Sequence, residues 1–447
     1  MAHALAGKPV QEQDIIDVQT IVDAYFDNVP DMTNPTQLVS FGTSGHRGTS
    51  VDGTFTDLHV AAITQAICDG RKQFGATGPI FVGQDTHALS QPALVTVLEV
   101  LAGNGVTAMV DCDMAFVPTP SVSRAIIRYN EEHDDKADGI IITPSHNPPD
   151  NGGIKYNTII GGPADTVVTK WIEMRANEYL TAYCESEDFK RISIDNIEPT
   201  AQVPYDYKGL YVEELGDVIN MEAIKAAGPK VLVDTLGGSG ASYWNAIKER
   251  YGLDLTIIHD DYDPTFSFMT YDHDGKVRMD CSSTYVMASV INRIGDFDLA
   301  VGNDPDYDRY GIVVSSGLIS ANTFLTLAAR YLFTTRGWKN KGVGKTVVCT
   351  TMIDKWAADA ETPVFEVPVG FKYFSQLLFD GAIGIGGEES AGASFLKKDG
   401  TVWTTDKDGM IMALLSMEIM AVMGKSALKM ADEFVEEFGN PSFGRID

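Results

Sequence analysis

The segment PIFVGQDTHALSQPALVTVLEVLAGNGVTAMV, residues 79–110, decides the fold class of this chain. Residues 79–84 are an apolar, β-branched run of strand length. Residues 90–102 have the length and pattern of a helix, with Ser90 as the predicted N-cap and Gly103 as the stop. Residues 106–110 are a second strand, so the order strand, helix, strand predicts a parallel β–α–β unit buried on both faces.

The same unit recurs twice further along the chain. Residues 230–234 are a predicted strand that leads through the glycine-rich segment 237–240 into a helix. Residues 345–350 are a predicted strand that enters a helix near Ile353. Three copies of one unit in series predict related α/β domains, although no sequence repeat proves duplication.

Two segments mark the expected domain boundaries. Residues 194–208 are polar, contain two prolines and are a predicted linker, and residues 315–322 lie between a strand and a new helix. We expect residues 1–35 to form an arm and a helix packed on the first domain. The fold class predicted is α/β, with three consecutive related domains whose mixed, largely parallel sheets surround a central cleft: domain 1 over residues 1–205, domain 2 over 206–320 and domain 3 over 321–447.

The composition excludes several classes of protein. With 62 Asp and Glu against 34 Lys and Arg, the net charge is −28 over 447 residues, which disfavours nucleic acid and anionic membranes as partners. The longest apolar run, residues 410–423, is shorter than the roughly 20 residues of a membrane span, and no signal peptide is present in residues 1–10. Five scattered cysteines without a C-x-x-C pair indicate reduced thiols and a cytoplasmic location.

The segment TPSHNPP, residues 143–149, directly follows an apolar strand at residues 139–142. Its prolines fix a tight loop at the end of that strand, where α/β proteins bind their ligands, and hold the Ser145 hydroxyl outward. An ordinary proline-rich turn is one interpretation. A serine nucleophile with His146 as base is another, but adjacent residues seldom reach that geometry and no G-x-S-x-G motif is present. A serine that accepts and donates phosphate fits better.

The segment GNDPDYDR, residues 302–309, follows a predicted strand at residues 297–301. Its carboxylates Asp304, Asp306 and Asp308 are spaced so that an irregular loop can direct all of them at one hard cation. Oxygen ligands without His or Cys favour Mg²⁺ over Zn²⁺. The alternative is a solvated acidic turn.

Two further glycine-containing loops are candidates for ligand binding. The segment GGEESAG, residues 386–392, follows a predicted strand and places Glu388 and Ser390 on one side, where they could hold adjacent sugar hydroxyls. The segment FGTSGHRG, residues 41–48, exposes backbone N–H groups beside Arg47 and could bind an anion. A simple turn and a flexible linker are the respective alternatives.

At these four loops together the sequence resembles the α-D-phosphohexomutase superfamily, and it looks most like the bacterial glucose-specific phosphoglucomutase branch. The match runs in the right order over essentially the whole chain, and it includes the segment DNGGIKYN at residues 150–157. Four ordered signatures are highly specific, so the plainer interpretations of the single loops lose weight. The resemblance implies three family domains around a cleft.

The resemblance also implies the reaction and its residues. It implies reversible interconversion of glucose 1-phosphate and glucose 6-phosphate through a phosphoserine and a glucose 1,6-bisphosphate intermediate, with Mg²⁺ as cofactor. Ser145 would carry the phosphoryl group, and Ser145, Asp304, Asp306 and Asp308 would hold the metal. The other implied roles are catalytic for Arg47, His146, Lys155 and Lys407 and substrate-binding for Ser44, Arg309, Gly370, Lys372, Glu388 and Ser390.

One departure from the family affects the expected activity. Members carry a fourth domain with an Arg-Pro-Ser-Gly-Thr-like loop that clamps the non-reacting phosphate, and these 447 residues contain no such loop. We therefore expect the fourth domain to be missing here and turnover by these residues alone to be low. Small sugar phosphates are the expected partners, and a homodimer is an open possibility.

The charge of the chain makes the mutase hypothesis testable, and two alternatives to it stay open. An anionic sugar phosphate requires that six cationic candidates gather in one cleft: His46, Arg47, Lys155, Arg309, Lys372 and Lys407. A Mg²⁺-dependent phosphatase with an aspartate nucleophile and a noncatalytic sugar-phosphate-binding protein are the alternatives. A phosphate on Ser145, on an aspartate or on neither distinguishes the three.

Overall fold

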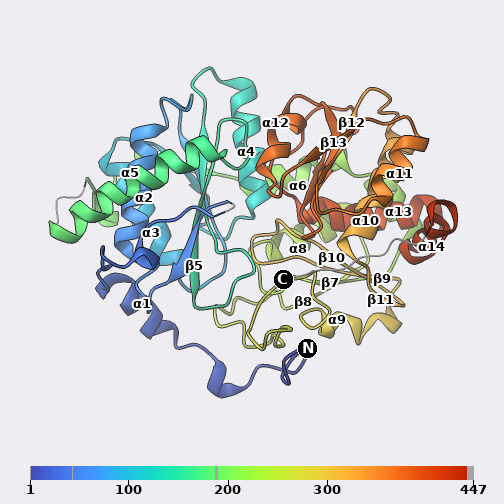
Figure 1. The fold of residues 1–447 in the computed structure, drawn as a ribbon, viewed down its shortest axis with the longest axis horizontal. Coiled ribbons are helices and arrows are strands. Elements are labelled where there is room, and N and C mark those ends of the chain that lie inside the picture. The colour runs from blue at the N-terminus through green and yellow to red at the C-terminus, as the bar shows by residue number, and fades with distance from the viewer. Residues whose placement is uncertain (1, 43, 187–189, 440–447) are drawn as a thin grey trace.

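The structure, a computed structural model, describes residues 2–42, 44–186 and 190–439. The described strands form three sheets, each with helices packed against it. Figure 1 shows the first sheet and its helices on one side of the molecule, with the second and third sheets stacked on the other. Parallel pairs form the body of every sheet and antiparallel pairs lie at one edge, which confirms the predicted mixed α/β class.

The first sheet has the strand order β1-β5-β4-β2-β3-β6. Strand β4 pairs in parallel with β2 and antiparallel with β5, so the loop that carries Ser145 leaves the middle of the sheet. The strands are β1 (His46–Thr49), β2 (Ile80–Gln84), β3 (Ala108–Asp111), β4 (Asp138–Ile142), β5 (Asn151–Asn157) and β6 (Gln202–Tyr205). The helices are α1 (Val18–Asp27), α2 (Asp57–Gly70), α3 (Ser90–Gly103), α4 (Thr119–Glu132) and α5 (Thr166–Glu185).

Alternate residues of the central strands pack on opposite faces of this sheet. Ile140 and Ile142 join the cluster built by α1, α2, α3 and α5, whereas Phe81 and Ile141 join the cluster built by α4. Because helices cover both faces, the central strands are buried along their length, which is why they are recognisable as continuous apolar runs.

The second sheet has the order β11-β10-β9-β7-β8. Strand β9 pairs in parallel with β7, and the acidic loop begins directly after β9 ends. Its strands are β7 (Val231–Asp234), β8 (Leu255–Ile258), β9 (Leu299–Gly302), β10 (Gly311–Val314) and β11 (Gly317–Leu318). Its helices are α6 (Tyr207–Val218), α7 (Met221–Ala227), α8 (Ala241–Tyr251) and α9 (Ala288–Ile291).

The third sheet has the order β13-β12-β14-β15. Its strands are β12 (Gly342–Thr346), β13 (Val364–Val367), β14 (Ile383–Gly387) and β15 (Ala393–Phe395), and its helices are α10 (Ala321–Arg336), α11 (Met352–Asp359), α12 (Lys372–Phe379), α13 (Gly409–Met423) and α14 (Ala427–Phe438). The described helices include none that is long and apolar enough by itself to span a membrane. Only α13 and α14 taken together pass that test, across a bend of 77°.

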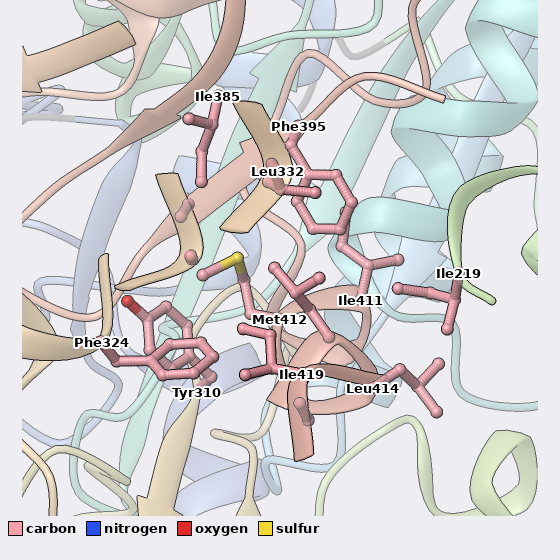
Figure 2. Close-up of a cluster of buried hydrophobic side chains, with 14 of the residues drawn as sticks. Ile219, Tyr310, Phe324, Leu332, Ile385, Phe395, Ile411, Met412, Leu414 and Ile419 are labelled. Atoms are coloured by element: carbon pink, nitrogen blue, oxygen red, sulfur yellow. The ribbon is translucent and has the colours of Figure 1, made fainter. Parts of the chain in front are cut away.

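Helix α13 joins the second and third sheets into one core. Every residue from Gly409 to Ile419 is buried, because the helix is mainly apolar and its Glu418 carboxylate is paired with Arg336. Figure 2 shows the α13 side chains between Ile219 of the second unit and Ile385 of the third, and all of them belong to one buried cluster. These two units therefore form a single packed body beside the first.

Four local expectations were wrong. Ser90 is the first residue of α3 rather than its cap, and its hydroxyl donates to Asp85. The predicted linker at residues 194–208 contains β6, which pairs with β3. The predicted strand at 345–350 lies earlier, at β12, because residues 347–350 form a turn. Although α1 packs on the first domain as expected, the N-terminal arm bonds to the second unit, where Gly7 donates to Tyr271 O.

Candidate active site

Ser145 leaves strand β4 in a strained conformation. Its φ is +62°, the left-handed region, which costs a residue other than glycine roughly 1–3 kcal/mol. The backbone N–H of Ser145 donates to the Thr143 hydroxyl at 2.8 Å. Its side-chain hydroxyl donates to Asp304 Oδ2 at 2.9 Å and lies 3.2 Å from His146 Nδ1. Two signatures 159 residues apart in sequence are therefore direct neighbours.

The three aspartates of the acidic loop converge on one point. One oxygen from each of Asp304, Asp306 and Asp308 lies within 4.8 Å of the others, and all three residues are buried. Within the described part of the chain, Asp306 Oδ1 and Asp308 Oδ1 have no hydrogen-bond partner. Unpartnered carboxylate oxygens in an all-oxygen cluster fit a hard divalent cation.

The surroundings of the acidic loop shift the pKa values of two of its carboxyls in opposite directions. Burial, together with the charges of Asp306 and Asp308, raises the pKa of Asp304 well above its usual value. Burial also opposes ionisation of Asp308, but the ammonium groups of Lys407 and Lys155 outweigh it and lower the pKa of Asp308. A bound cation would offset the burial and the repulsion that raise the pKa of Asp304.

A buried lysine, Lys155, and a half-buried one, Lys407, balance part of this negative charge. Lys155 Nζ lies 2.6 Å from Asp306 Oδ2 and 3.3 Å from Asp308 Oδ2, and Lys407 Nζ lies 2.7 Å from Asp308 Oδ2. Burial lowers the pKa of Lys155, but Asp306 and Asp308 overcome that effect and raise it. In this arrangement Lys155 is an ammonium donor, so it is poorly suited to accept a proton.

A cavity of about 240 Å³ opens beside Ser145 and collects residues from all three units. Its walls carry the cations Arg47, Arg309, Lys372 and Lys407, which cluster here despite the acidic total charge. Such a concentration of cations attracts an anionic ligand. The lining residues are Ser44, Arg47, Ser145, His146, Asn147, Pro163, Arg309, Val369, Phe371, Lys372, Glu388, Glu389, Ser390 and Lys407.

Lys155 is not among the residues that line the cavity, and His46 is not one of these cations either, contrary to the expectation. It is 3% exposed and stacks between Phe55 and His59, because β1 pairs with β5 and turns the imidazole into the core of the first unit. Burial lowers the pKa of His46 to about 4, so the ring is neutral near pH 7. Arg47 is the residue of β1 that lines the cavity, and its Nη2 donates to Ser44 Oγ at 3.3 Å.

His146 lines the cavity as a neutral ring. Burial, with the nearby charge of Arg309, lowers the pKa of His146 to about 3. Near pH 7 the imidazole is therefore uncharged. It lies close enough to the Ser145 hydroxyl for a hydrogen bond.

The loop after β14 lies across the cavity from Ser145. Glu388 and Ser390 both line the wall, and Ala391 next to them has a φ of +67°. Gly370 is not among the residues that line the cavity. Its N–H donates to Glu388 Oε1 at 3.0 Å and so positions that carboxylate. Burial raises the pKa of Glu388.

Sequence reasoning missed the residues that fix the acidic loop. Thr119, at the start of α4, donates from its hydroxyl to Asp306 Oδ2 and from its backbone N–H to Asp306 O. Asn303 Nδ2 donates to Arg309 O at 2.9 Å, which ties the two ends of the loop. The Pro118-Thr119-Pro120 sequence was the only local signal for Thr119, and it is typical of any helix start.

Comparison with known proteins identifies the family of this chain. Three models of the phosphoglucomutase/phosphomannomutase family match in order: alpha/beta/alpha domain I at residues 38–182, domain II at 210–317 and domain III at 320–438. A phosphoglucomutase of Komagataeibacter xylinus is 47% identical over 447 residues, which covers 99% of this chain and 80% of that protein. Phosphoglucomutase 1 of Saccharomyces cerevisiae is 28% identical and covers 91% and 74% of the two chains.

A solved structure shows the same fold. The open form of the Paramecium phosphoprotein parafusin, a phosphoglucomutase, superposes with a TM-score of 0.73 at 20% identity over 92% of this chain and 76% of that one. The models of three domains of one family match this chain in sequence order. A phosphoglucomutase is also 47% identical to it over nearly its full length. The chain belongs to the phosphoglucomutase/phosphomannomutase family.

Proposed function

We propose that this chain interconverts glucose 1-phosphate and glucose 6-phosphate through a phosphorylated Ser145. The observation that carries the proposal is the 2.9 Å contact between the Ser145 hydroxyl and Asp304, at the edge of a cavity lined by four cations. A serine placed between a carboxylate cluster and cationic walls is suited to carry a phosphoryl group. Phosphoryl transfer depends mainly on such positioning and charge stabilisation.

The first half-reaction moves the phosphoryl group from the enzyme to the sugar. The Oγ–P bond of phosphorylated Ser145 breaks as a bond forms from the phosphorus to O6 of glucose 1-phosphate. The O6 proton passes to a carboxylate of the cavity, and the released Ser145 Oγ takes up a proton from solvent, so that it is left as a hydroxyl. Arg47 and Arg309 stabilise the negative charge on the transferring group. Lys155, held as an ammonium by Asp306 and Asp308, is a donor rather than the base in this step.

The second half-reaction returns a phosphoryl group to the enzyme. The intermediate, glucose 1,6-bisphosphate, turns over in the cavity so that its 1-phosphate faces Ser145. The O1–P bond breaks as the Ser145 oxygen takes the phosphoryl group and loses its proton to solvent. O1 takes the proton held by the carboxylate, and glucose 6-phosphate leaves. In this proposal Glu388 and Ser390 hold sugar hydroxyls in either orientation and Lys372 contacts the phosphate that does not react, and all three line the cavity.

Mg²⁺ is the ion that we assign to the acidic cluster. Ser145, Asp304, Asp306 and Asp308 would hold it, and it would supply positive charge beside the transferring group. The all-oxygen donor set and the two unpartnered carboxylate oxygens support Mg²⁺ over zinc.

Glucose phosphates and a cytoplasmic location complete the proposal. The preference for glucose over mannose rests on resemblance to relatives named phosphoglucomutase, and the ratio of kcat/KM for the two sugar 1-phosphates tests it. All five cysteines are free, which supports a reducing compartment.

Mass spectrometry of the chain after incubation with glucose 1,6-bisphosphate and Mg²⁺ tests the mechanism. Phosphate is expected on the peptide that contains Ser145. Ser145→Ala should abolish it, and Ser186→Ala, an exposed serine outside the cavity, is the matched control. Phosphate on an aspartate would instead identify a phosphatase, and a chain that stays unphosphorylated would be a sugar-phosphate-binding protein.

A further inference from the structure

Two buried residues behind the Ser145 loop have no part in the chemistry described so far. Asp85 and His87 follow strand β2, are 0% and 1% exposed, and do not line the cavity. Burying an acid and an imidazole together is costly unless their hydrogen bonds are satisfied. Their partners show what they hold in place.

His87 connects Asp85 to the far side of the Ser145 loop. Its Nδ1 lies 2.8 Å from Asp85 Oδ2, and its Nε2 lies 3.0 Å from the carbonyl oxygen of Asn147. A carboxylate and a carbonyl oxygen can only accept, so both ring nitrogens donate. His87 is therefore fixed at both ends.

Asp85 also holds the near side of the same loop. The Thr143 hydroxyl donates to Asp85 Oδ2 at 2.6 Å and accepts the backbone N–H of Ser145 at 2.8 Å. The Ser90 hydroxyl donates to Asp85 Oδ1, so both carboxylate oxygens are engaged. The Asp85–His87 pair is thus hydrogen-bonded to the loop at two places, at Thr143 before Ser145 and at Asn147 after it.

Hydrogen bonds at both Thr143 and Asn147 explain how Ser145 keeps its strained backbone conformation. A φ of +62° persists only when surrounding contacts impose it, and the contacts on both sides of Ser145 lead to the same carboxylate. We propose that Asp85 and His87 are positioning residues for phosphoryl transfer. By holding Thr143 and Asn147, they keep the Ser145 hydroxyl directed at Asp304. The inference rests on the proposed function, because it assumes that Ser145 carries the phosphoryl group.

Paired variants of His87 separate its hydrogen bond to Asp85 from its hydrogen bond to Asn147. His87→Asn keeps a donor that can reach Asp85 but is too short for Asn147, whereas His87→Gln keeps a donor near the Nε2 position and loses the bond to Asp85. Thr143→Val removes the bridging hydroxyl at constant shape, and Thr143→Ser retains it. Thr64→Val is the control for loss of a buried hydroxyl, since the Thr64 hydroxyl donates to Val60 O within helix α2.

The measurement is the single-turnover rate at which glucose 1,6-bisphosphate phosphorylates Ser145, followed by mass spectrometry over a range of bisphosphate concentrations. Misplacement of a reacting atom by about 1 Å costs on the order of 100-fold in rate. We expect that loss in the saturating rate for Thr143→Val and a smaller loss for each His87 variant. The half-saturating concentration should stay unchanged, because none of these side chains lines the cavity. Thr143→Ser should restore the rate, and Thr64→Val should keep it.

Three outcomes overturn the inference. Saturating rates equal to the parent's in the His87 variants and in Thr143→Val would show that the hydrogen bonds of Asp85 and His87 do not position Ser145. A rise in the half-saturating concentration with an unchanged saturating rate would show a role in binding instead. If the parent itself acquires no phosphate on Ser145, the proposed function fails first and the inference falls with it.

Discussion

The hydroxyl of Thr119 donates a 2.8 Å hydrogen bond to Asp306 Oδ2, so the first unit directly orients a carboxylate of the second. The backbone N–H of Thr119 also donates to Asp306 O at 2.9 Å. These bonds leave Asp306 Oδ1 without a hydrogen-bond partner among the described residues, and it is available to a cation. Thr119 therefore connects the placement of helix α4 to the shape of the proposed metal site.

Replacing Thr119 should weaken metal binding. Loss of a residue that orients a metal ligand typically costs about 10- to 100-fold in affinity or activity, and we expect Thr119→Val to raise the Mg²⁺ concentration for half-maximal Ser145 phosphorylation by that factor. Thr119→Ser keeps the hydroxyl and should behave as the parent does. An unchanged Mg²⁺ requirement in Thr119→Val would contradict the role of this contact.

Lys155 should stabilise the chain when no metal is present. It is 4% exposed and neutralises Asp306 and Asp308, so removing its ammonium leaves buried carboxylates uncompensated. Breaking such a pair costs about 3–5 kcal/mol. We expect Lys155→Met to lower the Tm strongly in EDTA and Mg²⁺ to recover much of the loss, because the ion supplies the missing charge.

An exposed lysine provides the control for that experiment. Lys170 makes a salt bridge to Glu173 with its side chain 63% exposed, and surface pairs of this kind contribute about 0–1 kcal/mol. Lys170→Met should therefore hardly change the Tm. A Lys155→Met variant as stable as the parent in EDTA would show that the carboxylates are balanced in another way.

His46 should make the stability of the chain depend on acidity. Burial lowers the pKa of His46 to about 4 in the folded chain, below the value of 6.5 expected when it is unfolded. The folded state is therefore fully favoured above pH 6.5, and it loses stability as the pH falls toward 4 and the unfolded ring takes up a proton. The loss amounts to roughly 2 kcal/mol at pH 5.

The Tm measured from pH 7.5 to 5 tests this dependence. His46→Gln replaces the titrating ring with an uncharged donor, and its Tm should fall less steeply with acidification than that of the parent. Equal slopes for the two proteins would mean that other groups account for the acid sensitivity.

The parts of the fold and site that could be predicted are those with a strong local pattern. The apolar run before Ser145 and the spacing of Asp304, Asp306 and Asp308 are recognisable in the sequence, because polar loop residues directly follow apolar strand residues in both segments. The ends of parallel strands lie at one edge of a sheet, so a general rule then predicted that such loops bind ligands.

The parts that could not be predicted depend on contacts between distant segments. Thr119 and Asp306 are 187 residues apart, and neither Thr119 nor His87 stands in a distinctive local motif. His46 was misjudged for the same reason. A glycine-rich segment suggests exposure, but pairing of β1 with β5 buries the ring against Phe55.

Gly409 should be required for the geometry of the acidic loop. It is the first residue of α13, and its N–H donates to Tyr307 O at 2.9 Å. A Cβ at this position would overlap the carbonyl oxygen of Arg309, which is backbone and cannot turn aside. We expect Gly409→Ala to displace the loop, at a cost of about 1–3 kcal/mol for overpacking, and to raise the Mg²⁺ requirement of Ser145 phosphorylation.

Gly295→Ala is the matched control, because its added Cβ would meet no atom within 4 Å. Its Tm and Mg²⁺ requirement should equal those of the parent. If Gly409→Ala also matched the parent in both measurements, the close approach of α13 to the acidic loop would not set the metal geometry. A fall in Tm with an unchanged Mg²⁺ requirement would confine the effect of Gly409 to packing, since a displaced loop must alter the convergence of Asp304, Asp306 and Asp308.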